Sequence, residues 1–206
     1  MHRQIGPGDQ PGPINLRPDG QEAAFRMATN IEIKARVQDC ERLRQLAETL
    51  SDTPCVTLLQ EDTFFNTPGG RLKLRSLAPD QGQLIYYVRD DAAGPKRSDY
   101  VISTTTEPDA LKAVLAASVG IRGVVCKQRL LYRVGNTRIH LDEVEGLGAF
   151  VELEVVLLPG QSEQEGQATA VELMAKLGIQ DSDLLEVAYI DLLEKAIELN
   201  DGRTTS

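Results

Sequence analysis

Charged and apolar residues alternate along several short segments of this chain. In NIEIKAR (30–36), Ile31, Ile33 and Ala35 alternate with polar or charged residues. Successive side chains of a β-strand point to opposite faces of the sheet, so such a segment has one apolar and one charged face. The pattern predicts a sheet whose apolar face is covered, while its charged face meets either water or a ligand.

The same alternation recurs in RLKLR (71–75), YVRD (87–90), CKQR (126–129), IHLD (139–142) and FVELEV (150–155). The first of these places three cations on one face, and the last places two glutamates on one face. The polar positions of these segments are Arg71, Lys73, Arg75, Tyr87, Arg89, Lys127, Arg129, His140, Asp142, Glu152 and Glu154.

Hairpin spacing and helical periodicity together predict an α+β fold that is mainly β. Strands are expected at 30–36, 61–67, 71–76, 82–91, 98–104, 124–135, 137–148 and 149–158. Helices are expected at 39–50, 108–120, 162–178 and 181–199, with Asp39 as an N-cap and a capping box at Ser162 and Glu165. An antiparallel barrel of about eight strands, or a strongly curved sheet, fits this order best, with the helices packed outside.

One domain is expected, because the chain shows no internal repeat and no linker. It should span 27–199, with a frayed tail at 200–206. Residues 1–26 are rich in Gly, Pro and polar residues and show no periodicity, which predicts a disordered tail. Met27 is the expected true start of the protein.

For any one strand, a solvated charged face is the simplest explanation. Several such strands together weaken it, because like charges on neighbouring strands destabilise a sheet unless anions lie among them. If helices cover the apolar faces, the charged faces point into the barrel. Unpaired charges cannot form a dry core, so the interior must hold water, metal and a polyanion.

The residue types indicate which polyanion this is. Lys and Arg donors match phosphate oxygens, and Arg can bind them through two hydrogen bonds. Glu152 and Glu154, two residues apart on one strand, suit Mg²⁺ or Mn²⁺, which prefer oxygen ligands. A phosphate chain bridged by a divalent metal is what phosphoryl or nucleotidyl transfer requires.

Composition excludes other classes of function. The net charge of −9 does not favour nucleic-acid binding, and no apolar run approaches the length of a membrane span. Three widely separated cysteines argue against a disulfide framework and for a reducing cytoplasm. Two histidines are too few for a multi-histidine metal centre. A homodimer is compatible with the sequence.

Several of these segments resemble the CYTH family, also called triphosphate tunnel metalloenzymes. They are NIEIKAR, RLKLR, CKQR, LDEVEGLGAFVELE and AYIDLLEK, within residues 29–196. The resemblance implies an eight-stranded antiparallel tunnel with a charged interior, which takes a triphosphate together with Mg²⁺ or Mn²⁺. The family includes class IV adenylate cyclases, thiamine triphosphatases and inorganic triphosphatases.

The resemblance also implies roles for individual residues. Catalytic roles fall on Glu32 and Lys34. Phosphate binding is expected at Lys34, Arg36, Lys73, Arg75, Arg89, Lys127 and Arg129, and metal binding at Glu32, Asp142, Glu152 and Glu154. The first glutamate of the family's Glu-x-Glu-x-Lys pattern is Asn30 here, which keeps a carbonyl oxygen but carries no charge.

Three functions remain open at this point. The turn GLG-x-F (146–150) resembles the cyclase branch, which would convert ATP to cyclic AMP and pyrophosphate. The alternative is a triphosphatase that hydrolyses inorganic triphosphate, thiamine triphosphate or a nucleoside triphosphate. Asn30 also leaves room for a polyphosphate-binding module without turnover.

His140 is expected to be a structural hydrogen-bonding residue, although a role as a donor in the tunnel is the alternative.

Overall fold

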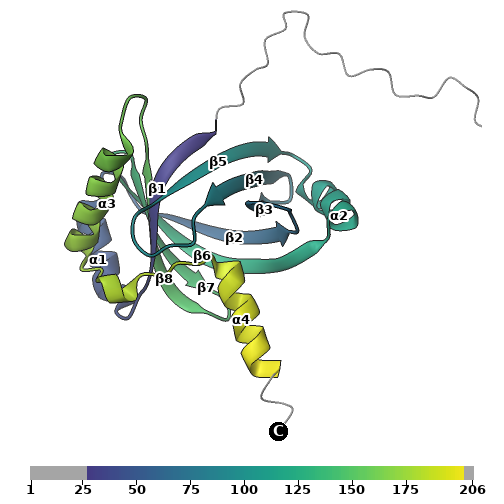
Figure 1. The fold of residues 1–206 in the computed structure, drawn as a ribbon. Helices are drawn as coiled ribbons and strands as arrows, with labels where there is room; N and C mark the ends of the chain where they lie inside the picture. The colour runs from purple at the N-terminus through teal and green to yellow at the C-terminus, as the bar shows by residue number, and fades with distance from the viewer. Residues whose placement is uncertain (1–26, 202–206) are drawn as a thin grey trace, which may run out of the picture.

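The computed structural model describes residues 27–201, and its strands form a closed antiparallel barrel (Figure 1). Around the barrel the strand order is β1-β5-β4-β3-β2-β6-β7-β8. The strands are β1 (Ala28–Arg36), β2 (Val56–Phe65), β3 (Arg71–Ala78), β4 (Gln81–Arg89), β5 (Lys96–Thr105), β6 (Ile121–Val134), β7 (Thr137–Val144) and β8 (Gly148–Val156). The predicted eight-stranded barrel with outer helices is confirmed.

The apolar faces of the strands point outward, where two helices cover them. Ile33 of β1 and Leu153 of β8 belong to one buried cluster with Leu43 of α1 (Cys40–Leu50) and Leu173 of α3 (Glu163–Leu177). In Figure 1 both helices lie on the same side of the barrel, against β1 and β8. The alternation in NIEIKAR therefore turns its charged positions into the lumen.

Both helices begin at the predicted caps. The Asp39 side chain accepts a hydrogen bond from the backbone N–H of Arg42, and Ser162 and Glu165 form the full capping box. Gly166 lets α3 approach the barrel closely, because a Cβ there would lie 2.8 Å from Cγ1 of Ile31 and 2.5 Å from Leu157. A third helix, α2 (Pro108–Ser118), lies at the other end of the barrel in Figure 1.

The expected helix at 181–199 is wrong at its start. Asp181–Asp183 form a short 3₁₀ helix, the chain then runs without helix, and α4 begins only at Tyr189 and ends at Asp201. Leu184 makes an isolated bridge with Ala35, and the N–H of Leu185 donates to the carbonyl of Lys34. Pairing with β1 keeps this segment out of the helix, although its sequence is helical in character.

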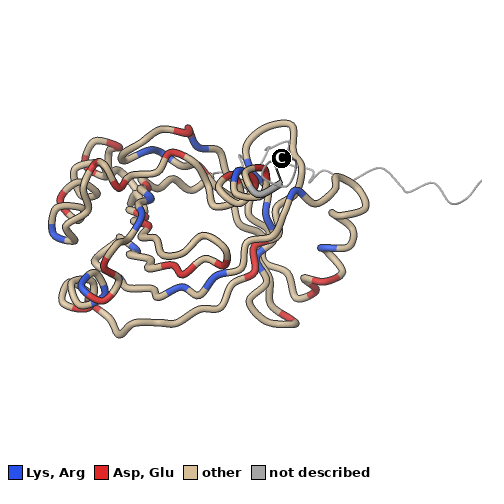
Figure 2. Tube along the Cα trace, turned by 90° about the horizontal axis from the view of Figure 1, so that it is seen from below, with Lys and Arg blue, Asp and Glu red and all other residues tan. Residues whose placement is uncertain are grey.

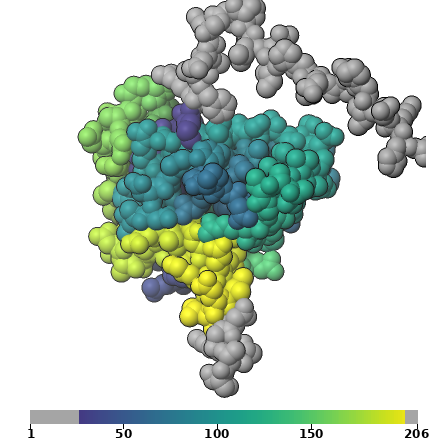
Figure 3. All heavy atoms as spheres, turned by 45° about the vertical axis from the view of Figure 1, so that its right-hand side comes forward, coloured from purple at the N-terminus to yellow at the C-terminus, as the bar shows by residue number. Residues whose placement is uncertain are grey.

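This C-terminal segment, residues 184–190, closes one end of the lumen. Tyr189 and Ile190 pack in a buried cluster with Phe64, Val125 and Phe150, and the Tyr189 ring lies 5.0 Å from the Phe150 ring. Figure 3 shows the yellow C-terminal residues covering one side of the strands, with α4 extending away from the body. The barrel is therefore filled at this end and hollow at the other.

Lys96 anchors the C-terminal segment to the barrel. Its buried ammonium group donates to the backbone carbonyls of Leu185 at 3.1 Å, Glu186 at 3.0 Å and Ala92 at 2.7 Å. We expect Lys96→Met to lower the free energy of unfolding by about 1–3 kcal/mol, because buried acceptors lose their donor. Urea unfolding measures this. Lys112→Met is the control, because the partly exposed ion pair of Lys112 with Glu61 should contribute less than about 1 kcal/mol. Equal decreases in the free energy of unfolding for the two variants would contradict the anchoring role of Lys96.

The expected tail at 1–26 and residues 202–206 lie outside the described residues. Among the described residues, no helix combines the length and the hydropathy needed to cross a membrane.

Candidate functional site

The lumen contains two connected regions. A deep cavity of about 70 Å³ lies against Tyr189 and Ala188, and a wider mouth of about 370 Å³ opens from it. The two share the lining residues Lys73, Arg75, Tyr87, Arg129 and Glu154. The charged faces of the strands thus surround a continuous space.

Cationic side chains outnumber carboxylates in the lining of the deep cavity, although the chain carries −9 overall. Six cations face four carboxylates there: Lys34, Lys73, Arg75, Arg89, Lys127 and Arg129 against Glu32, Asp62, Glu152 and Glu154. Figure 2 shows cationic and acidic residues interspersed along the trace rather than gathered in separate regions. The cavity is therefore suited to an anion, and its carboxylates hold the cations in place until one arrives.

Arg129 is held in place by two carboxylates. Its guanidinium donates two hydrogen bonds of 2.6 Å to Asp142 and a third to Glu152. Lys34 pairs with the other oxygen of Glu152, and its Nζ lies 3.3 Å from the centre of the Tyr189 ring. These contacts join β1, β6, β7, β8 and the C-terminal segment around one anion-binding space.

Among the described residues, the side-chain partners of Asp142 are cationic or phenolic. Besides Arg129, it accepts a hydrogen bond of 3.0 Å from the Tyr189 hydroxyl, and Lys127 lies 3.6 Å away. The residue is 2% exposed, and the neighbouring cations hold the pKa of its carboxyl well below the ordinary value despite burial. Its metal-binding role stays a prediction, while these contacts favour a role in positioning Arg129.

Asp62 of β2 is a second shared carboxylate, which the sequence analysis missed. It accepts hydrogen bonds from Lys73 at 3.0 Å and from Arg75 at 2.7 Å, and Lys127 lies 3.7 Å away. Its position in the alternation of β2, opposite Arg75 of β3, was the available signal. Asp62 holds three of the expected phosphate ligands together.

Glu32 of β1 pairs with Arg89 of β4, past the intervening strand β5. The Nε and Nη2 atoms of Arg89 are buried and have no hydrogen-bond partner among residues 27–201, so donors remain available to a bound phosphate. Arg36, in contrast, is exposed at the end of β1, with its guanidinium 5.3 Å from the Phe150 ring. The structure brings all the expected phosphate ligands to the deep cavity except Arg36.

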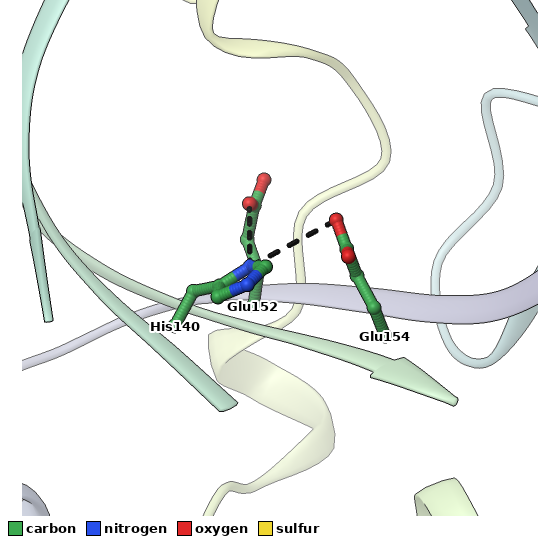
Figure 4. Close-up of side chains that lie close together, drawn as sticks. All are labelled: His140, Glu152 and Glu154. Carbon is green, nitrogen blue, oxygen red and sulfur yellow. Dashed lines mark ion pairs between the residues drawn. The ribbon is translucent and has the colours of Figure 1, made fainter. Parts of the chain in front are cut away.

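A possible metal site lies where the deep cavity meets the mouth. His140 of β7 and Glu152 and Glu154 of β8 each offer a ligand atom, and these atoms lie within 4.8 Å of one another (Figure 4). Within the described part of the chain, Asn30 Oδ1 and His140 Nδ1 are buried without hydrogen-bond partners, and both residues line the mouth with Glu154. Glu154 and the two unsatisfied atoms, together with Glu152, whose oxygens are shared with Lys34 and Arg129, fit a divalent cation.

Burial makes the deep lysines unusually acidic. It lowers the pKa of Lys127 to about 7, assisted by neighbouring Arg129, and lowers the pKa of Lys34 well below the ordinary value, assisted by Lys127. A bound polyanion would favour the charged amines. The ligand-free lumen therefore carries electrostatic strain that an anion relieves.

This strain predicts a pH dependence of stability. Between pH 7 and about 10, Lys127 is more protonated in the unfolded chain than in the folded one, so the free energy of unfolding rises with pH. Below pH 7 Lys127 is protonated in both states. The free energy of unfolding then no longer depends on pH through this residue and stays at its lower value. We expect Lys127→Met to reduce the slope between pH 7 and 9 by about 1 kcal/mol per pH unit, measured by urea unfolding of ligand-free protein. An unchanged slope would contradict the lowered pKa.

Comparison with known proteins agrees with this geometry. The family model that describes the CYTH domain matches residues 28–189. The chain belongs to the CYTH domain family. Its match covers the whole barrel and ends at Tyr189, the residue that closes the lumen.

Other CYTH proteins resemble the chain over most of its length. Adenylate cyclase CyaB from Aeromonas hydrophila is 27% identical over 197 residues, which covers 88% of this chain and 97% of that protein. PH1012 from Pyrococcus horikoshii has the same fold, with a TM-score of 0.69 at 24% identity, over 79% of this chain and 98% of that one. HpAC1 from Hippeastrum, described as having a dominant triphosphatase activity, superposes with a TM-score of 0.58 at 18% identity, over 81% of this chain and 96% of that one.

Proposed function

We propose that this CYTH protein is a divalent-metal-dependent enzyme that binds a triphosphate in the barrel lumen, and that it converts ATP to cyclic AMP and pyrophosphate. The lining of the mouth is the observation that favours an organic triphosphate over inorganic triphosphate. Beside its charged groups the mouth has an apolar and aromatic lining, which inorganic triphosphate does not need: Leu58, Leu77, Ile85, Tyr87, Tyr100, Ile102 and Leu131. The 27% identity to an adenylate cyclase supports the same choice.

The two regions suggest how ATP lies. A nucleoside fits the wider mouth, where Tyr87 and Tyr100 can contact a base, and the terminal phosphates fit the cation-rich deep cavity. The α-phosphate then lies at the boundary, near Arg75, Arg129 and Glu154, which line both regions. In this arrangement the pyrophosphate leaving group stays among the deep cations.

The residues then have distinct tasks. Attack by the ribose 3′-hydroxyl on the α-phosphorus forms the cyclic ester, breaks the bond to pyrophosphate and releases the hydroxyl proton to solvent. Lys34, Lys127 and Arg129 neutralise the negative charge of the leaving pyrophosphate. A metal held by Glu152 and Glu154 would supply Lewis-acid stabilisation of phosphate oxygens. Glu32 holds Arg89 towards the phosphates. Catalytic roles for Glu32 and Lys34 remain part of this proposal.

Hydrolysis of a triphosphate is the second candidate. HpAC1, which shares the fold, is described as having a dominant triphosphatase activity, and the deep cations would neutralise the phosphates of the substrate in the same way. Water would then attack the terminal phosphorus instead of the ribose oxygen attacking the α-phosphorus. Binding without turnover is the third possibility, and Asn30 still allows it.

Product analysis separates these candidates. Purified protein is incubated with Mg²⁺ or Mn²⁺ and with ATP, inorganic triphosphate or thiamine triphosphate, and the products are followed by ³¹P NMR. Cyclic AMP with pyrophosphate supports the proposal, and free phosphate supports the triphosphatase. Retained triphosphate with measurable affinity would leave only a binding module.

We place the enzyme in the cytoplasm, as the three cysteines suggest; Cys40, Cys55 and Cys126 are all free thiols. A homodimer, and the lack of nucleic-acid or membrane partners, remain proposals that rest on the sequence.

A further inference from the structure

We propose that His140 is a nitrogen ligand of the lumen metal and makes the site prefer a first-row transition ion, such as Mn²⁺ or Co²⁺, over Mg²⁺. This inference rests on the proposed function only because both place a divalent metal in the lumen. The type of ligand and the preference for one ion over another are additional to the proposed function.

The position of the imidazole carries the proposal. His140 is 4% exposed, and its Nδ1 has no hydrogen-bond partner among the residues that the structure describes. That atom lies 3.7 Å from a carboxylate oxygen of Glu152 and 3.8 Å from one of Glu154, which is too long for hydrogen bonds. An ion about 2.0–2.2 Å from each atom of such a pair fits between them. Figure 4 shows Nδ1 facing both carboxylates.

The register of the strands produces this arrangement. His140 of β7 lies directly opposite Glu152 of β8, and Glu154 lies opposite Arg138, two residues along. All these side chains point to the same face of the sheet, because positions two apart share a face. The imidazole is therefore fixed by the barrel itself and is not carried on a loop.

A neutral imidazole nitrogen has a lone pair available for coordination. The unsatisfied Oδ1 of Asn30, which lines the same mouth, offers a further oxygen.

Ligand type determines the preferred ion. Mg²⁺ takes oxygen ligands almost exclusively, whereas imidazole nitrogen suits transition ions. The nitrogen of His140 therefore favours Mn²⁺ or Co²⁺ over Mg²⁺. The uncharged Asn30 lowers the affinity for all of these divalent ions and does not discriminate between them.

Electron spin echo spectroscopy of bound Mn²⁺ tests the ligand directly. We expect ¹⁴N modulation from imidazole in the wild-type protein and its loss in His140→Gln, which replaces the nitrogen with an amide group. The chain has only one other histidine, His2, so His2→Gln is the matched control and should keep the modulation. Persistent modulation in His140→Gln, its absence in wild type, or no Mn²⁺ binding would overturn the proposal. If Nδ1 binds a buried water instead of a metal, the wild-type protein should show no ¹⁴N modulation.

Affinity measurements test the selectivity. His140→Gln should weaken Mn²⁺ binding about tenfold or more, while Mg²⁺ affinity, measured by competition, should change by less than about threefold. Equal losses for both ions would contradict the selectivity. Triphosphate turnover without ¹⁴N modulation of bound Mn²⁺ would refute this inference and leave the proposed function intact. ¹⁴N modulation without any turnover would refute the proposed enzymatic function and leave His140 as a metal ligand.

Discussion

Asp142→Asn is expected to lower the free energy of unfolding by about 3–5 kcal/mol, because it leaves buried cations without their counter-charge. Arg129 loses a two-point ion pair, and Lys127 loses a neighbour at 3.6 Å. Adding tripolyphosphate should stabilise this variant more than the wild type, since the unpaired cations gain an anion. Urea unfolding with and without tripolyphosphate measures both effects.

The same variant separates positioning from metal binding. If Asp142 acts through Arg129, the affinity for Mn²⁺ should change little while stability falls. Glu143→Gln is the control, because Glu143 is the exposed neighbour on the other face of β7 and should leave both quantities unchanged. Loss of Mn²⁺ binding at unchanged stability would instead establish Asp142 as a metal ligand.

Glu154→Gln should lower metal-dependent turnover by about 10²–10³-fold, because the metal site loses a charge close to the reacting phosphate. The amide can still accept the hydrogen bond of 3.0 Å that Arg138 donates to Glu154, so the fold should survive. Steady-state kinetics across a Mn²⁺ series, with Glu143→Gln as control, measures the effect.

Excess Mn²⁺ should restore part of the activity of Glu154→Gln, since the other ligands remain. Full turnover at ordinary metal concentration would show that the metal lies elsewhere in the lumen.

Much of the fold was predictable because period-two alternation is a local signal. In a strand such as NIEIKAR, a few residues are enough to distinguish the apolar face from the charged face. The amphipathic helices indicate that the apolar face is covered. The same alternation placed Lys34, Arg129 and Glu152 on the lumen wall. Closure of the sheet, in contrast, depends on the pairs β1·β5, β1·β8 and β2·β6, which join strands that are not consecutive and which hairpin spacing does not reveal.

Other features depend on register, which local patterns do not reveal. Asp62 matters because β2 places it beside Arg75, and His140 matters because β7 places it opposite Glu152. Residues 184–188 have helical composition, yet pairing with β1 keeps them out of the helix. Arg36 follows the alternation, but the strand ends there, so its side chain reaches solvent.

The central claim is that a metal and a triphosphate bind together inside the barrel. Crystals grown with Mn²⁺ and a non-hydrolysable ATP analogue, measured at the manganese absorption edge, test it directly. We predict an anomalous peak between His140, Glu152 and Glu154, with the terminal phosphates among Lys34, Lys127 and Arg129. An ordered analogue and manganese on the outer surface, with no density in the lumen, would contradict the account.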